Sequence, residues 1–107
     1  MGYPGEFELL VLLSIMRLRD GAYGVTIREE VEKKTSRTLT LGAVYKTLGR
    51  LEGKGLLDTK VAPPTKARGG RRKKLYTLTP AGFGATSRSL EDLQRMTDGL
   101  EPELKLS

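Results

Sequence analysis

The side chains best suited to chemistry in this 107-residue chain are cations, and the chemistry they suit is phosphate binding. The sequence holds 19 lysines and arginines but no histidine and no cysteine. Those two absences remove the usual general base near neutral pH, the thiol nucleophile, disulfides and the commonest metal ligands. A zinc site would need carboxylates alone, so we expect neither a metal nor a cofactor. No credible pair of catalytic carboxylates is evident either, so we do not expect an enzyme.

The cations are concentrated in residues 66–74, which read KARGGRRKK and contain six basic residues and no acid. The rest of the chain is balanced at 13 basic and 13 acidic residues, so the whole net charge of +6 lies in this segment. A polyanionic partner explains this distribution better than general solubility does. We predict contacts with double-stranded DNA from Lys66, Arg68, Arg71, Arg72, Lys73 and Lys74. A solvated charge run, or a basic edge that blocks strand aggregation, is the alternative.

The hydrophobic pattern predicts the elements that must position these cations. Helices are expected at 6–18, 25–35 and 41–53, strands at 56–62 and 71–79, and a fourth helix from Pro80 behind the N-cap Thr79. This order predicts a mainly α fold with a small β-hairpin, a winged helix-turn-helix whose wing carries the basic segment. Residues 1–79 would form the DNA-binding part and residues 80–107 a C-terminal dimerisation helix and tail, within one structural domain.

The third helix is the candidate recognition helix, which in this fold lies in the major groove. Its apolar residues repeat at three and four positions, so the opposite face should turn toward DNA. Arg50 could bind guanine O6 and N7, Lys46 a base or a phosphate, and Tyr45 a phosphate. The predicted contacts from this helix are Thr40, Gly42, Ala43, Tyr45, Lys46 and Arg50. Taken alone, the pattern favours an ordinary amphipathic helix with a solvated charged face, because most lysines and arginines are simply exposed.

The first and fourth helices carry more apolar surface than one small core can cover. The first is apolar almost all round, and the fourth shows a heptad seam that Pro102 limits. We therefore predict a homodimer formed through Leu9, Leu10, Leu13, Phe83, Leu90, Leu93, Met96 and Leu100. The alternative is that both helices complete the core of a monomer.

The one long apolar run, residues 9–16, is too short for a membrane span of about 20 residues. It follows two glutamates instead of a basic segment, and no small-residue cleavage site follows it. We expect a cytoplasmic protein without a membrane partner.

Four segments in order resemble the PadR family of transcriptional regulators over about residues 5–84: GEFELLVLLSIMRL, GAYGVTIREEVE, LTLGAVYKTLGRLEGKGLL and GGRRKKLYTLTPAGF. The resemblance implies a winged helix-turn-helix dimer in which the C-terminal helix of one subunit packs on the N-terminal helix of the other. It implies promoter binding, usually with repression. Tyr45, Lys46 and Arg50 would face DNA and residues 71–74 would lie in the wing, although many relatives have proline in place of Lys46.

The resemblance also implies a small-molecule effector, since some relatives release DNA when phenolic acids or planar drugs bind near the dimer interface. This chain contains no tryptophan, which argues against a drug-stacking site, and it resembles the short branch of the family. Two other readings stay open. The same charges would serve a nonspecific, architectural DNA-binding protein, and a winged helix can also be a protein-interaction module.

Overall fold

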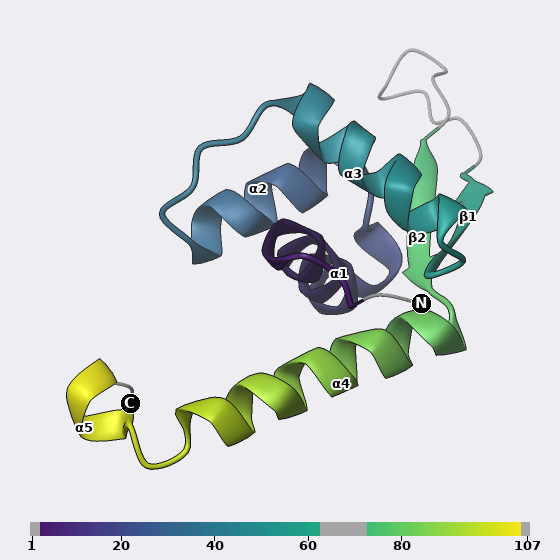
Figure 1. Ribbon diagram of the computed structural model, residues 1–107. Coiled ribbons are helices and arrows are strands. Elements are labelled where there is room, and N and C mark those ends of the chain that lie inside the picture. The colour runs from purple at the N-terminus through teal and green to yellow at the C-terminus, as the bar shows by residue number, and fades with distance from the viewer. Residues whose placement is uncertain (1–2, 63–72, 106–107) are drawn as a thin grey trace.

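The chain forms three helices, a hairpin and a long C-terminal helix, seen in a computed structural model that describes residues 3–62 and 73–105 (Figure 1). The predicted order is confirmed: a mainly α fold with one two-stranded antiparallel hairpin. A turn of 3₁₀ helix, η1 (Arg19–Gly21), joins the first two helices. The other elements are α1 (Glu6–Leu18), α2 (Gly24–Lys34), α3 (Leu41–Gly53), β1 (Leu57–Val61), β2 (Lys74–Leu78), α4 (Pro80–Thr97) and α5 (Glu101–Leu104).

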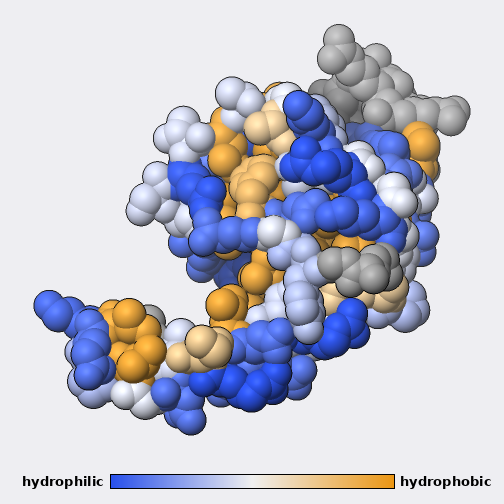
Figure 2. Space-filling model, viewed as in Figure 1, coloured by the Kyte–Doolittle hydropathy of each residue, from blue (hydrophilic) through white to orange (hydrophobic). Residues whose placement is uncertain are grey.

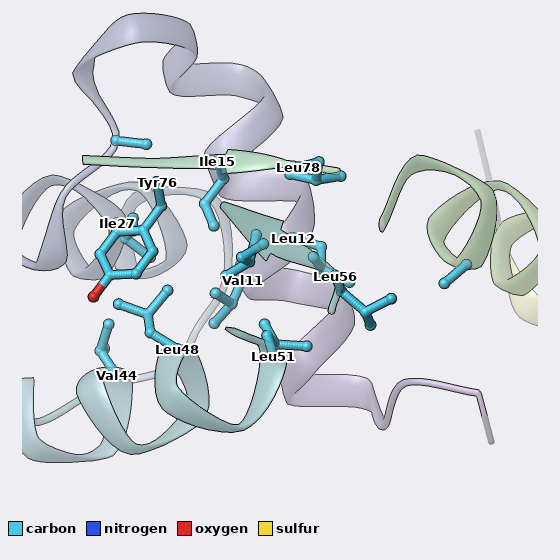
Figure 3. Packing of buried hydrophobic residues seen from close by; sticks show 13 residues of the cluster. Val11, Leu12, Ile15, Ile27, Val44, Leu48, Leu51, Leu56, Tyr76 and Leu78 are labelled. Carbon is cyan, nitrogen blue, oxygen red and sulfur yellow. The ribbon is translucent and has the colours of Figure 1, made fainter. Parts of the chain in front are cut away.

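Helices α1, α2 and α3 and the hairpin form the body of the molecule. Helix α1 lies at its centre and packs against α2, α3, α4 and β2 (Figure 1). Its side chains Val11 and Leu12 are fully buried, and they meet Leu48 and Leu51 from α3 (Figure 3). This helix is therefore buried on more than one side. Its nearly all-apolar sequence is what such a central position requires.

The hairpin pairs Leu57 with Leu78 and Thr59 with Tyr76. Alternation puts Leu57, Tyr76 and Leu78 on the buried face. The Tyr76 N–H donates to the Ala22 carbonyl at 2.9 Å, which fastens β2 to the connection between α1 and α2. Both strands are shorter than predicted, because residue 56 precedes β1, residue 62 follows it and residue 79 caps α4; residues 71–72 lie outside the described part of the chain.

Helix α4 begins as predicted, with Thr79 as its N-cap and Pro80 in the first turn. The Thr79 hydroxyl accepts from the Gly82 N–H at 3.0 Å and donates to the Gly55 carbonyl at 2.7 Å. Gly82 lies so close to the preceding turn that a Cβ there would be 2.2 Å from the Leu56 carbonyl oxygen. The helix can approach the hairpin this closely because position 82 has no side chain.

The end of α4 corrects the predicted heptad seam. The helix ends at Thr97, and Gly99 then takes a φ of 85°, a left-handed conformation typical of the residue after a helix. Leu100 consequently lies in the turn before α5 and not on α4, so placing it on the seam was wrong. Pro102 does not limit α4 either, since it lies in the first turn of α5.

Candidate nucleic-acid interface

The exposed face of α3 carries the side chains that the 3.6-residue period assigned to it. Val44, Leu48 and Leu51 are fully buried, as predicted, and Thr47 joins them at 1% exposure. The Thr40 hydroxyl accepts from the Ala43 N–H at 3.1 Å, which confirms it as the N-cap. The residues exposed on the other side are Gly42, Ala43, Tyr45, Lys46, Gly49 and Arg50. Small residues beside a lysine leave a low surface that a duplex could approach closely.

Tyr45 is half-exposed at 50%, and its ring lies across the first residue of α2. A Cβ on Gly24 would be 2.4 Å from the Tyr45 hydroxyl oxygen. The ring therefore packs where position 24 offers no side chain. This contact places the phenol at the edge shared by α2 and α3, a position the sequence pattern did not specify.

Only the last two cations of the basic segment fall within the described part of the chain, while Lys66, Arg68, Arg71 and Arg72 lie outside it. The Lys73 Nζ lies 3.9 Å from the centre of the Tyr23 ring. The Lys74 Nζ lies 3.3 Å from the Glu52 Oε1 at the end of α3. Both cations are thus held against the helix-turn-helix, at the loop end of the hairpin where β2 begins.

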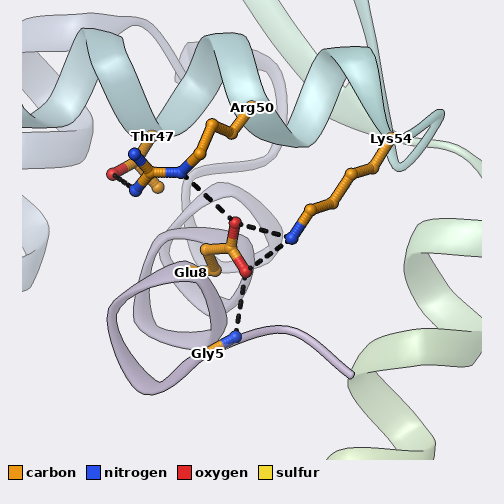
Figure 4. Close-up of polar contacts among 5 residues, drawn as sticks. All are labelled: Gly5, Glu8, Thr47, Arg50 and Lys54. Atoms are coloured by element: carbon orange, nitrogen blue, oxygen red, sulfur yellow. Dashed lines mark hydrogen bonds and ion pairs between the residues drawn. The ribbon is translucent and has the colours of Figure 1, made fainter. Parts of the chain in front are cut away.

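A buried carboxylate beneath α3 was missed by sequence reasoning (Figure 4). The Glu8 side chain on α1 is only 9% exposed. Its carboxylate accepts from the Lys54 Nζ at 2.9 and 3.0 Å and from the Gly5 N–H at 2.9 Å. The Arg50 Nε lies 3.6 Å from the same carboxylate, and the Arg50 Nη2 donates to the Thr47 hydroxyl at 3.2 Å. The Arg50 guanidinium is therefore drawn back against α1.

The charge state of Glu8 follows from these contacts. Burial raises the pKa of the Glu8 carboxyl, but hydrogen bonds from Gly5 and Lys54 and the charges of Lys54 and Arg50 outweigh burial. The net result is a pKa below the ordinary glutamate value, so the carboxyl is ionised at neutral pH. Burial also raises the pKa of the Tyr76 hydroxyl.

The predicted dimer residues fall into two groups. Leu9 is only 8% exposed in the single chain, so little of it is left for a partner, while Leu10 and Leu13 are partly exposed in a groove between α1 and α2. On α4 and beyond it, exposure is much higher: Phe83 49%, Leu90 41%, Leu93 53%, Met96 76% and Leu100 45%. Figure 2 shows apolar side chains in the hollow between α4 and the body and again on α5.

The exposed residues of α4 continue a face that is buried nearer its start. Residues 82, 85, 86 and 89 are the buried ones, and none is buried after Ser89. At about 100° per residue, Leu93 and Met96 fall on that same face one and two turns further on. Because α4 extends past the body, the chain itself does not cover them (Figure 1).

No group of three or more histidine, cysteine, aspartate or glutamate side chains in residues 3–62 and 73–105 is placed to hold a metal ion. No helix in the same ranges is long and apolar enough to cross a membrane.

Comparisons place this geometry among known proteins. Residues 12–88 match the transcriptional regulator PadR-like family. Among solved structures, a PadR family regulator from Clostridium difficile R20291 superposes with a TM-score of 0.74 at 22% identity, covering 95% of this chain and 100% of that one. The PcaV regulator from Streptomyces coelicolor, in complex with its natural ligand, gives 0.72 at 23% identity, covering 98% and 64%.

Bacillus subtilis PadR in complex with operator DNA gives a TM-score of 0.64 at 19% identity, covering 79% of this chain and 46% of that one. At these identities the structures establish the winged-helix fold and nothing further. No curated protein matches the sequence.

Proposed function

Since this chain belongs to the PadR-like family of transcriptional regulators, we propose that it is a DNA-binding regulator. It binds duplex DNA as a homodimer, with α3 in the major groove and the hairpin along the backbone, and represses transcription at a pseudo-palindromic promoter site. The observation that carries the proposal is the low, exposed face of α3 around Lys46, beside the start of β2 with Lys73 and Lys74. Bacillus subtilis PadR, which shares the fold, is a protein that binds operator DNA.

The two parts of this surface have different tasks. Phosphate contacts position a protein on DNA, whereas base contacts specify the sequence. We assign Lys73 and Lys74, with the cations at 66–72, to the backbone, and Thr40, Gly42, Ala43, Tyr45 and Lys46 to the groove and its edges. Arg50 lies four residues beyond Lys46 and would reach DNA only by leaving Glu8.

The dimer is supported by the uncovered face of α4. Leu93 and Met96 extend a face that packs inside the chain, yet they are 53% and 76% exposed. A second copy whose α1 and α4 cover this face would remove that surface from water, at about 25 cal/mol for each Å². A symmetric dimer also matches two half-sites about 34–36 Å apart, one turn of DNA. Sedimentation should then give twice the 11.8 kDa mass of the chain.

The test of DNA binding is fluorescence anisotropy with the DNA upstream of the protein's own coding region and with a scrambled duplex, at two salt concentrations. We expect the upstream DNA to bind more tightly at both. Equal, steeply salt-dependent binding to both would instead support the alternative, a nonspecific architectural protein. Absence of binding to either at low salt would overturn the DNA-binding proposal.

A matched pair of variants tests the hairpin. Replacing Lys73 and Lys74 with alanine should weaken binding to both duplexes and lower the slope of log affinity against log salt by roughly 0.9 for each lost phosphate contact. Replacing Lys33 and Lys34, exposed at the end of α2, removes the same charge away from the proposed surface and should leave the slope nearly unchanged. If both pairs change the slope equally, the hairpin has no special part in binding.

We also propose an effector site in the groove between the N-terminal segment and α4. It has a volume of about 310 Å³, and its apolar walls include Tyr3, Pro4, Leu9 and Leu93. Ser89, which is 9% exposed as a residue, lines the groove, and its hydroxyl oxygen is buried without a hydrogen-bond partner within the described residues. A small aromatic ligand with one polar group would satisfy it; PcaV, similar in fold, is a regulator with a bound ligand.

The effector proposal is tested with 4-hydroxybenzoate added to the preformed DNA complex. We expect DNA release, and a higher concentration for half-release in Ser89→Ala than in Ser87→Ala, which changes an exposed serine of the same helix. Equal sensitivity of the two variants, or no release, would remove this groove as the site for such ligands.

A further inference from the structure

The Glu8 carboxylate joins the start of α1 to a segment far away in the sequence, the last turn of α3 and its C-cap Lys54 (Figure 4). We propose that Glu8 is a negative determinant of DNA affinity, because it holds the Arg50 guanidinium against α1 and so removes this cation from DNA binding. The proposal rests on the DNA-binding function proposed above.

The first step is the direction of the Arg50 side chain. By helical period Arg50 belongs to the exposed face of α3, four residues after Lys46. Its guanidinium nevertheless turns toward the body, with Nε 3.6 Å from the Glu8 carboxylate and Nη2 bonded to the buried Thr47 hydroxyl at 3.2 Å. Both contacts hold the charge on the flank of α3. The side chain is still 51% exposed, so no packing barrier prevents it from leaving.

Among the three groups that contact the Glu8 carboxylate, Arg50 makes the longest and weakest contact. Lys54 approaches both carboxylate oxygens, at 2.9 and 3.0 Å, and the Gly5 N–H supplies a further bond at 2.9 Å. These two donors keep the buried carboxylate compensated when Arg50 leaves. An uncompensated buried charge would be costly, so a cluster without Lys54 could not release Arg50 in this way.

The third step is electrostatic. A carboxylate beside the recognition helix repels phosphate and competes with it for the guanidinium, which binds either anion through paired hydrogen bonds. While the contact to Glu8 persists, the Arg50 guanidinium is held on the flank of α3 and adds less to the attraction of DNA than a free side chain would. Removing the carboxylate releases Arg50, four residues from Lys46, and also Lys54 in the turn after α3. The expected signature is a contribution of Arg50 to DNA affinity that emerges only when Glu8 is absent.

The experiment is a double-mutant cycle of Glu8→Gln and Arg50→Met, read by anisotropy on the scrambled duplex across a salt series. Glutamine keeps the acceptor for the Gly5 N–H, and methionine keeps most of the aliphatic length of arginine. We expect Glu8→Gln to bind roughly three- to tenfold more tightly near 0.1 M salt, with the slope of log affinity against log salt steeper by about 0.9. Arg50→Met should remove most of that gain in the Glu8→Gln background, leaving only what the released Lys54 adds, and should change little in the parent.

Glu6→Gln is the matched control. Glu6 lies in the same turn of α1 and pairs with Arg37 instead of a residue of α3. The substitution Glu6→Gln therefore removes the same charge without releasing Arg50. We expect less than about a twofold change in affinity and an unchanged slope. Circular dichroism and urea unfolding establish that each variant is folded. If Glu8→Gln does not fold, Glu8→Asp replaces it in the experiment, because the shorter side chain draws the carboxylate away from Arg50.

Three results separate the outcomes. Unchanged affinity and slope in folded Glu8→Gln would overturn the proposal and leave Glu8 a structural residue. Equal weakening by Arg50→Met in both backgrounds would also overturn it, because Arg50 would then bind DNA while paired with Glu8. If the parent protein binds no DNA under any condition, the proposed function fails first, which is a different result from either.

Discussion

The two ends of the molecule bury their apolar residues in different ways. In the body, α1 is enclosed on several sides, and Val11, Leu12 and Leu48 are fully buried by other parts of the same chain. After Ser89 no residue of α4 is buried, although Leu93 and Met96 continue the packing face of the preceding turns. The helix-turn-helix is thus completed by its own sequence, whereas the distal part of α4 leaves apolar side chains that the described residues do not cover.

The largest effect should come from the core of the body. Leu48→Ala removes a fully buried side chain at the contact between α1 and α3, and we expect the free energy of unfolding to fall by about 2–5 kcal/mol. Leu104→Ala makes the same chemical change on α5, where the side chain is 49% exposed, and should cost far less. Urea unfolding of both variants checks the comparison. Similar losses would mean that the body is not the self-sufficient part.

The second prediction addresses the uncovered half of α4. Replacing Leu93 and Met96 with serine should weaken the proposed dimer by at least about a hundredfold, since two large side chains would leave the interface. Sedimentation at a series of concentrations measures the dissociation. The monomer should keep its helical circular dichroism spectrum, because neither side chain is buried in the single chain. If the variant instead lost helical structure while its association stayed the same, the distal part of α4 would be needed for folding and not for the dimer.

The third prediction concerns the junction between the regions. Gly82→Ala would place a methyl group 2.2 Å from the Leu56 carbonyl oxygen, a backbone atom that cannot rotate away. We expect about 1–3 kcal/mol of destabilisation, as for other overpacked sites, unless α4 shifts outward. Gly84→Ala is the control two residues later, where the nearest atom is the mobile guanidinium of Arg88 at 3.1 Å. Thermal unfolding of the two variants distinguishes a blocked junction from a general effect on α4.

Local sequence patterns predicted much of the body. The 3.6-residue period assigned both faces of α3, and Thr79-Pro80 marked the start of α4, because caps and periodic faces depend on neighbours within a few residues. The heptad seam failed at Leu100 for a local reason as well. Gly99 takes a left-handed conformation that ends the helix. An apolar repeat that continues past such a glycine no longer lies on the helix.

The contacts of Glu8 could not be predicted in the same way. Its partner Lys54 is 46 residues away, and no local pattern encodes that separation. The available signal was an acidic residue inside an otherwise apolar helix, which indicates a buried partner without identifying it. The same limit applies to Tyr45, whose packing on Gly24 depends on how α2 and α3 meet. Which side chains face outward was thus predictable, but which charges are already paired was not.

The smallest of the four predicted effects tests that paired charge through pH. The pKa of Glu8 is lower in the folded protein than the value of about 4.3 expected in the unfolded chain, so the ionised carboxyl stabilises the fold. This contribution is complete above the unfolded pKa and is lost as pH falls through the folded pKa. Between pH 6 and 3 the free energy of unfolding should therefore decline less in Glu8→Gln than in the parent. Glu6→Gln should keep the steeper decline, and identical profiles for all three proteins would show that the cluster beneath α3 contributes nothing to stability.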